Sequence, residues 1–173
     1  METKEAILKR RSIRKYLDKE VDEETITLLL KSAMAAPSAV NRRPWEFYVV
    51  KDKETLSLLR KSSPYTNIES PLIIVVCGNT LRGVSAILSD FWVQDCSAAT
   101  ENILLTATDL GLGSCWNGVY PLKSAIKKVK KILSLPLNIV PLSIIHIGYK
   151  NEEKEERTQY DEKRVHYISE RSK

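Results

Sequence analysis

The chain has 173 residues, of which 43% are hydrophobic and 28% are charged, an ordinary composition for a single globular domain with its own core. Its 27 basic and 22 acidic side chains leave a net charge of +5, which suits anionic small molecules better than a nucleic-acid groove. No apolar run is long enough to span a bilayer. We therefore expect one domain over residues 1–173, with no membrane or nucleic-acid partner.

The cysteines and the first residues indicate the compartment. Cys77, Cys96 and Cys115 lie in apolar surroundings, and no pair has the spacing of a metal site or a redox motif. The charged N-terminal residues contain no signal-peptide core. We therefore expect reduced thiols in a cytoplasmic protein.

Hydrophobic spacing divides the chain into helices and strands. Thr3, Asp22 and Asp52 are the expected N-caps. The predicted helices cover residues 3–10, 22–36, 52–61, 91–112 and 121–133. Runs of β-branched, aromatic or continuous apolar residues predict strands at 46–50, 72–77 and 141–149, with a short extended segment at 114–120. Because strands and helices do not alternate regularly, we expect an α+β sandwich around a mixed, mostly antiparallel sheet.

Three of these helices carry specific expectations. The first should bury Ile7 and Leu8, and the last should turn Leu122 inward. The helix over 91–112 has few charges and small residues in its middle, so it should be buried nearly all round and allow another helix to approach closely, within the chain or across a dimer axis.

The densest chemical signal is the stretch of residues 9–16, where five cations and one serine lie at the end of the first helix. Guanidinium groups match phosphate oxygens two at a time, and a serine adds a neutral donor. The stretch predicts a site for an anion such as a phosphate monoester, although a solvated basic face is the simpler interpretation of these residues alone.

Other catalytic motifs are missing from the sequence. The six glycines make neither a dinucleotide-binding fingerprint nor a Walker A motif. His146 lies in an apolar strand and is expected to be a core residue, while His166 has no partner at metal-ligand spacing. No serine or cysteine has a nucleophile signature. We infer that any chemistry belongs to a bound cofactor.

Three stretches in this order resemble the FMN-dependent nitroreductase family: residues 10–14, residues 36–45 and residues 110–118. The resemblance continues to residues 164–167 and so covers essentially the whole chain. It implies a nitroreductase-like three-layer sandwich that forms a homodimer, with FMN in two clefts at the subunit interface.

The resemblance also assigns cofactor-binding residues. The first stretch would hold the FMN phosphate and ribityl chain, the second would reach the partner's flavin, the third would lie near the ring, and a C-terminal cation would reach the phosphate. In chain order these residues are Arg10, Arg11, Ser12 and Arg14; Pro37, Ser38, Ala39 and Asn41; Trp116, Asn117 and Gly118; and Lys163 or Arg164. The second stretch is alternatively a rigid turn, Trp116 a core residue, and the last two a solvated tail.

Two residues depart from the pattern of the family. Val40 stands where glycine is usual, and valine resists positive φ, so the loop backbone is expected to differ. Arg43 stands where glutamine is usual and would place a fixed positive charge near the cofactor. This charge would strengthen phosphate or ring contacts, favour an anionic reduced flavin, or bias the site toward anionic substrates.

The function that the resemblance implies is hydride transfer from NADH or NADPH to flavin N5, followed by reduction of a second small molecule such as a nitroaromatic, a quinone or a flavin, with ping-pong kinetics. Alternatives are other reactions of the superfamily, namely enone or semialdehyde reduction, dehalogenation and flavin breakdown, or a non-catalytic FMN-binding protein. A nucleic-acid binder fits least, because the aromatic residues are not interleaved with the cations.

Overall fold

The computed structural model describes residues 1–83, 90–156 and 158–168. Its helices are α1 (Thr3–Lys9), α2 (Glu23–Met34), α3 (Lys53–Arg60), α4 (Phe91–Asp109) and α5 (Lys123–Ile132). Its strands are β1 (Trp45–Val50), β2 (Leu72–Asn79), β3 (Leu112–Gly118) and β4 (Ile139–Tyr149). These strands form one sheet in the order β1-β2-β4-β3, and every pair in it is antiparallel.

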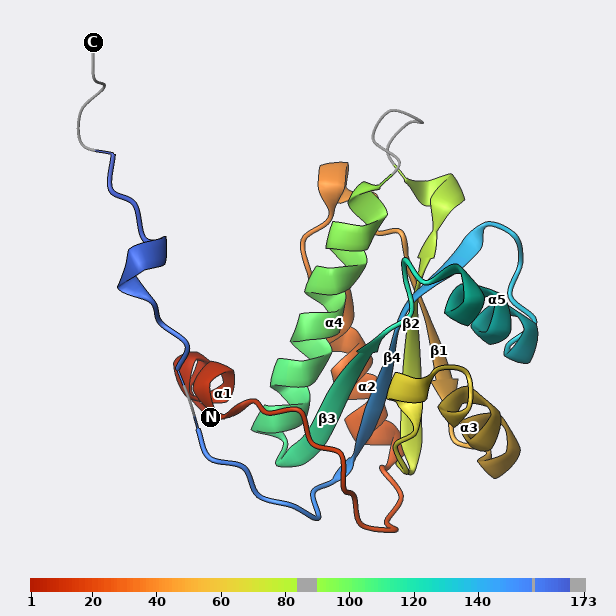
Figure 1. Cartoon of the computed structure of the whole chain (residues 1–173), viewed down its shortest axis with the longest axis horizontal. Helices are drawn as coiled ribbons and strands as arrows, with labels where there is room; N and C mark the ends of the chain where they lie inside the picture. Colours follow the sequence, from red (N-terminus) through yellow and green to blue (C-terminus); the bar gives the residue numbers. More distant parts are fainter. Residues whose placement is uncertain (84–89, 157, 169–173) are drawn as a thin grey trace.

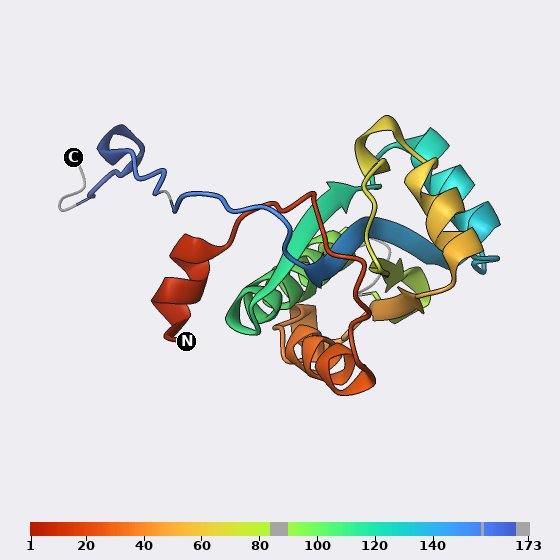
Figure 2. The same ribbon diagram turned by 90° about the horizontal axis from the view of Figure 1, so that it is seen from below.

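The sheet is the middle layer of three (Figure 1). Helices α2 and α4 cover one face, and α3 and α5 cover the other, which is clearest when the molecule is seen from below (Figure 2). Helix α1 lies to one side and contacts α4. The nitroreductase-like three-layer sandwich that the resemblance implied is therefore confirmed. Among the described helices, none combines the length and apolar composition needed to cross a membrane.

Side chains of the two central strands point alternately to the two faces of the sheet, so the core has one part on each face. On β2, Ile74 and Val76 face the α2–α4 layer, whereas Ile73 and Val75 face the α3–α5 layer, and all four are fully buried. Successive side chains of a strand point to opposite faces, so a strand buried on both faces needs a continuous apolar sequence. The predicted buried strand is thus confirmed.

Helix α4 is the long helix that was predicted, but within one chain it is not buried nearly all round, and it ends earlier than predicted. It stops at Asp109 rather than residue 112, because Gly111 adopts a φ of 74°, a conformation that ends helices. Leu112 already begins β3. One face of α4 is fully buried, most of its other side chains are partly buried, and Phe91, Gln94 and Asp109 are exposed.

Two of the expected N-caps are confirmed, and the other termini differ. Asp22 and Asp52 accept hydrogen bonds from the first turns of α2 and α3. Helix α1 is preceded by Glu2 rather than capped by Thr3, and no side chain caps it. Helix α5 starts at Lys123, two residues after Pro121.

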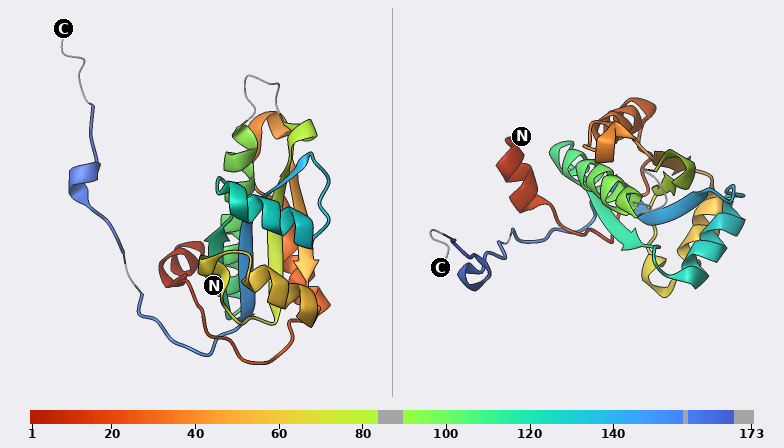
Figure 3. Two further views of the ribbon diagram at one scale, coloured as in Figure 1. Left: turned by 45° about the vertical axis from the view of Figure 1, so that its right-hand side comes forward. Right: turned by 90° about the horizontal axis from the view of Figure 1, so that it is seen from above.

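Three apolar side chains are exposed against expectation. Ile7 and Leu8 of α1 are 52% and 45% exposed, and Leu122 at the start of α5 is 47% exposed. Only Ala6 of α1 is buried. The helix stands beside the body of the molecule (Figure 3). The prediction that Ile7 and Leu8 are buried is therefore wrong for this chain, because little of its described part packs against them.

His146 is a buried core residue, as the sequence predicted. It lies on β4 with no exposed surface, and its Nδ1 atom lies 2.8 Å from the Ser70 hydroxyl. Its Nε2 atom is buried without a hydrogen-bond partner. Burial, assisted by the nearby Arg60, lowers the pKa of His146 from 6.5 to about 4.

This pKa predicts a loss of stability in mild acid. Because the unfolded chain binds the proton more tightly, the free energy of unfolding should fall as the pH decreases from about 6.5 to about 4, by about 3 kcal/mol in total. His146→Gln should flatten this part of the curve measured by denaturant titration. The exposed His166→Gln variant is the control and should keep the slope of the wild type; equal slopes in all three proteins would refute the assignment.

Candidate functional site

A cavity with a volume of about 420 Å³ lies where α1 ends. It is formed by the end of α1, the link that follows, and the segment after β4. The residues that line it are Ile7, Leu8, Arg10, Arg11, Ser12, Arg14, Lys154, Thr158 and Gln159. The structure thus brings together the four N-terminal residues predicted to bind an anion, and it adds Lys154 to them.

The link is held in place by its apolar member. Ile13 is only 4% exposed, and its N–H donates to the Ser114 carbonyl of β3 at 2.9 Å. A β-carbon on Gly113 would lie 2.7 Å from the Ile13 side chain, so only glycine allows this approach. The backbone of Ser12 forms a parallel bridge with Ser114. The alternation of basic and apolar residues therefore buries Ile13 and leaves its basic neighbours at the cavity.

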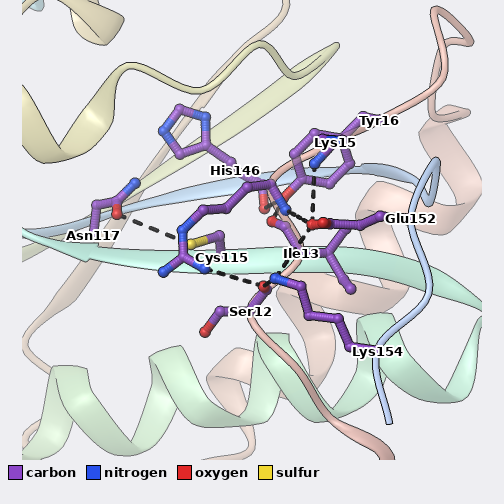
Figure 4. Close-up of polar contacts among 10 residues, drawn as sticks. Ser12, Ile13, Lys15, Tyr16, Cys115, Asn117, His146, Glu152 and Lys154 are labelled. Carbon is purple, nitrogen blue, oxygen red and sulfur yellow. Dashed lines mark hydrogen bonds and ion pairs between the residues drawn. The ribbon is translucent and has the colours of Figure 1, made fainter.

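Tyr16 fixes the other end of the link. Its hydroxyl donates to the Ile13 carbonyl at 2.5 Å and lies 3.2 Å from the His146 carbonyl. Burial raises the pKa of Tyr16, so the hydroxyl remains protonated and can donate. Residues 13–16 are thus fastened to both β3 and β4, as the close-up shows (Figure 4).

The arginines differ in how their charges are compensated. Arg10 pairs with Glu101 of α4 at 3.3 Å. The Arg14 guanidinium group donates to the Ser12 carbonyl at 3.3 Å, and the Nε atom of Arg11 is buried without a partner among the described residues. Among the described residues, neither Arg11 nor Arg14 forms an ion pair with a carboxylate. Two guanidinium groups at one cavity are therefore available to an anionic ligand.

Sequence reasoning missed Lys154. It is not among the predicted site residues, yet its Nζ atom donates to the Ser12 carbonyl at 2.6 Å. It also pairs with Glu152 at 3.4 Å. The available signal was a single lysine among glutamates shortly after the last strand, which by itself is typical of a solvated loop.

The loop at residues 37–43 lies elsewhere in the chain, beside the start of α4. The Ala39 N–H donates to the buried Asp95 carboxylate at 2.9 Å, and the Arg43 N–H donates to the Ser38 hydroxyl at 2.9 Å. These bonds support the rigid-turn interpretation. Pro37 and Asn41 are exposed, and none of the predicted residues of the loop lines the cavity.

The backbone of this loop is unusual. Val40, Asn41 and Arg43 all have positive φ, at 52°, 54° and 47°. Valine was expected to resist this conformation, yet Val40 adopts it with an 80% exposed side chain. A β-branched residue in the left-handed region is a rare exception that its surroundings must hold in place, and the two hydrogen bonds to Asp95 and Ser38 do so.

The third predicted group lies on the edge strand β3. Trp116 packs against the α2–α4 core, which supports its interpretation as a core residue. Asn117 points to the other face with Cys115 and, across the pair with β4, His146 (Figure 4). Asn117 is 7% exposed, and its Nδ2 atom has no hydrogen-bond partner. Gly118, which follows it, is exposed. Asn117 thus presents a buried amide that lacks an acceptor.

Lys163 and Arg164 are not brought to the cavity. They belong to a short 3-10 helix (Glu162–Arg164) in a tail that runs away from the sheet (Figure 1). Both are exposed, and Arg164 pairs with Asp161 at 3.1 Å. Within this one chain, the solvated-tail interpretation describes them.

The thiols are unsuited to nucleophilic chemistry. All three cysteines are free and buried. Burial raises the pKa of Cys96 to about 12 and raises the pKa values of Cys77 and Cys115 as well. A protonated thiol is a poor nucleophile and a poor metal ligand. The described part of the chain also holds no group of three or more His, Cys, Asp and Glu side chains able to bind a metal.

Comparison with known proteins gives concordant results. The nitroreductase family model matches residues 7–69 and 67–149. A protein of Methanothermobacter thermautotrophicus, provisionally named NADH dehydrogenase/NAD(P)H nitroreductase, is 44% identical over 169 residues, which are 96% of this chain and 86% of that protein.

Solved structures agree. A protein from Parabacteroides distasonis with the same provisional name has a TM-score of 0.90 and 41% identity, covering 95% of this chain and 96% of that one. The FMN-dependent nitroreductase of Clostridium difficile has a TM-score of 0.83 and 38% identity, covering 94% and 96% of the two chains. From its family match, its close relative and its fold, the chain belongs to the nitroreductase family.

Proposed function

We propose that this protein is an FMN-dependent oxidoreductase that uses NADH or NADPH to reduce a second small molecule. The observation that carries the proposal is the cavity with Arg10, Arg11, Ser12 and Arg14, where two guanidinium groups have no carboxylate partner in the described part of the chain. The names of its relatives support the choice of cofactor and electron donor, because they include FMN-dependent and NAD(P)H nitroreductases.

The residues fit the chemistry of this cofactor. A phosphate monoester carries a charge of about −1.5 to −2 at neutral pH, which balances Arg11 and Arg14. Arg10 and Ser12 add further donors at the same cavity. The unpartnered amide of Asn117 is suited to a ring carbonyl or nitrogen, which would supply the acceptor that this buried group lacks.

Bound FMN would supply the chemistry, accepting a hydride at N5 and delivering the electrons to the acceptor. The protein's own residues would bind and orient it. The three thiols remain protonated, and the His146 ring is enclosed in the core, so neither supplies an acid–base group to the cavity. The proposed acceptors are nitroaromatics, quinones or flavins. The free buried thiols favour a cytoplasmic location.

We further propose a homodimer with FMN at the interface. One chain leaves the loop at 37–41 and the cations at 163–164 away from the cavity. It also leaves apolar side chains exposed on α1 and on the tail, where Tyr160, Tyr167 and Ile168 are between 72% and 88% exposed. A two-fold related copy would cover such surfaces and let each chain contribute to its partner's site.

The first prediction concerns the phosphate. Charge-assisted hydrogen bonds contribute about 1.5–3 kcal/mol each, so Arg14→Gln should weaken FMN binding about tenfold or more. Riboflavin, which lacks the phosphate, should bind both proteins with similar affinity. Fluorescence titration of the apoprotein measures both ligands, with Arg82→Gln as the control. Equal FMN affinity in the wild type and Arg14→Gln would exclude this role of the cavity.

The second prediction concerns the order of events. With one cleft serving both substrates, the oxidised donor should leave before the acceptor binds. Initial rates at several donor and acceptor concentrations should give parallel double-reciprocal lines, the pattern of a ping-pong mechanism. Intersecting lines would instead show that donor and acceptor bind together, and they would count against a shared cleft.

The third prediction concerns the shared site. One chain carries Arg14→Ala, and the other carries Ser38→Ala with Asn41→Ala. If each site uses the arginines of one chain and the loop of the other, a mixed dimer has one intact site and one doubly damaged site. Random mixing of the two variants should then restore about a quarter of the wild-type activity, since about half of the dimers are mixed.

The measurement requires that each parent homodimer is nearly inactive and that subunits exchange under mild denaturant. Differently tagged chains report exchange by co-purification. If mixed dimers form and activity stays at the level of the parents, the loop and the arginines serve the same chain's site, and the shared arrangement is wrong.

A further inference from the structure

Two side chains from the segment after β4 hold the arginine-bearing link by its main chain. The Glu152 carboxylate accepts hydrogen bonds from the Arg14 N–H at 2.5 Å and the Lys15 N–H at 3.3 Å. The Lys154 ammonium donates to the Ser12 carbonyl at 2.6 Å. Figure 4 shows both side chains converging on this link from the same side. Three peptide groups of residues 12–15 are therefore fixed by side chains that lie 137 or more positions away.

An acidic residue such as Glu152 is unexpected beside a site for an anion. Hydrogen bonds from the Arg14 N–H and Lys154 lower the pKa of its carboxyl group, so it is ionised at neutral pH. Its side chain is 20% exposed. A carboxylate beside an anion site repels the ligand and by charge alone should reduce affinity. Its two bonds to main-chain amides indicate a different contribution, namely the shape of the link.

The Lys154 ammonium group has one more N–H donor than its contacts with Ser12 and Glu152 use. An ammonium group has three N–H donors. One reaches Ser12, and the ion pair with Glu152 at 3.4 Å accounts for a second. The side chain is 26% exposed and lines the cavity with the arginines. The remaining donor is therefore available to an anion in that cavity.

We propose that Glu152 and Lys154 form a clamp that completes the anion site. Glu152 is a positioning residue, which holds the backbone of residues 14 and 15 so that Arg14 is fixed at the cavity. Lys154 is a ligand-binding residue, which adds a cation to the same phosphate. This inference rests on the proposed function and assigns to Glu152 and Lys154 roles that the sequence did not indicate.

The decisive experiment measures whether Glu152→Gln strengthens or weakens FMN binding. Glu152→Gln removes a negative charge from a basic cavity, so electrostatics alone predicts tighter FMN binding. The clamp predicts weaker binding, about threefold to tenfold, because a neutral amide is a poorer acceptor for the two N–H groups. Glu153→Gln is the matched control. Glu153 is next in sequence, 85% exposed and paired with Lys150 at 3.5 Å. Loss of its charge should leave affinity unchanged or slightly higher.

A second measurement is independent of the cofactor. In the ligand-free protein, Glu152→Gln should speed amide hydrogen exchange at Arg14 and Lys15, while Glu153→Gln should not. If the wild type binds no FMN, the proposed function fails, and this exchange measurement still decides the positioning role. Tighter FMN binding by Glu152→Gln, or unchanged exchange at both amides, would overturn that role.

The role of Lys154 is tested by comparing the binding of ligands with and without a phosphate group. Lys154→Gln should weaken FMN binding several-fold, leave riboflavin binding unchanged, and weaken competition by inorganic phosphate. Lys150→Gln, which removes an equal charge outside this cavity, should do none of these. An equal loss of riboflavin and FMN affinity in Lys154→Gln would show a structural effect and would refute a contact with the phosphate.

Discussion

The hydrogen bond between the Ile13 N–H and the Ser114 carbonyl is the attachment on which the site depends. This bond attaches the basic link to the outer edge of β3, the edge strand whose other side pairs with β4. The buried Ile13 side chain packs over Gly113 and holds the link close to the sheet. The Tyr16 hydroxyl holds the C-terminal end of the link. Three cationic residues are thus presented from a rigid sheet rather than from a free loop, which lowers the ordering cost of binding an anion.

The arrangement also explains why so many charges are tolerated in one place. Arg10 is paired with Glu101, and Lys154 with Glu152, so only part of the positive charge is left for a ligand. If every cation were paired with a carboxylate, no positive charge would remain to attract an anion. If none were paired, repulsion between the like charges would destabilise the link. The partial pairing keeps the link stable and still leaves Arg11 and Arg14 for the ligand.

Local signals predicted the layers and much of the site, while contacts between distant segments did not follow from them. The apolar runs of β2 and β4, the caps Asp22 and Asp52, and the basic cluster at residues 10–14 are all readable within a few residues. Glu152 and Lys154 act on peptide groups at the opposite end of the chain, and no local pattern encodes that distance. Ile7 and Leu8 show the converse: their apolar character predicted burial, but both are about half exposed, because little of the described chain packs against them.

The position of β4 has a consequence for how the protein is made. This strand lies between β2 and β3, yet it is the last strand among the described residues, at Ile139–Tyr149. While the ribosome is still adding these residues, β2 and β3 have no common partner, and each exposes an unpaired edge. The four strands can pair in full only after residues 139–149 have been synthesised, so the nascent protein depends on long-range pairing and is open to aggregation until then.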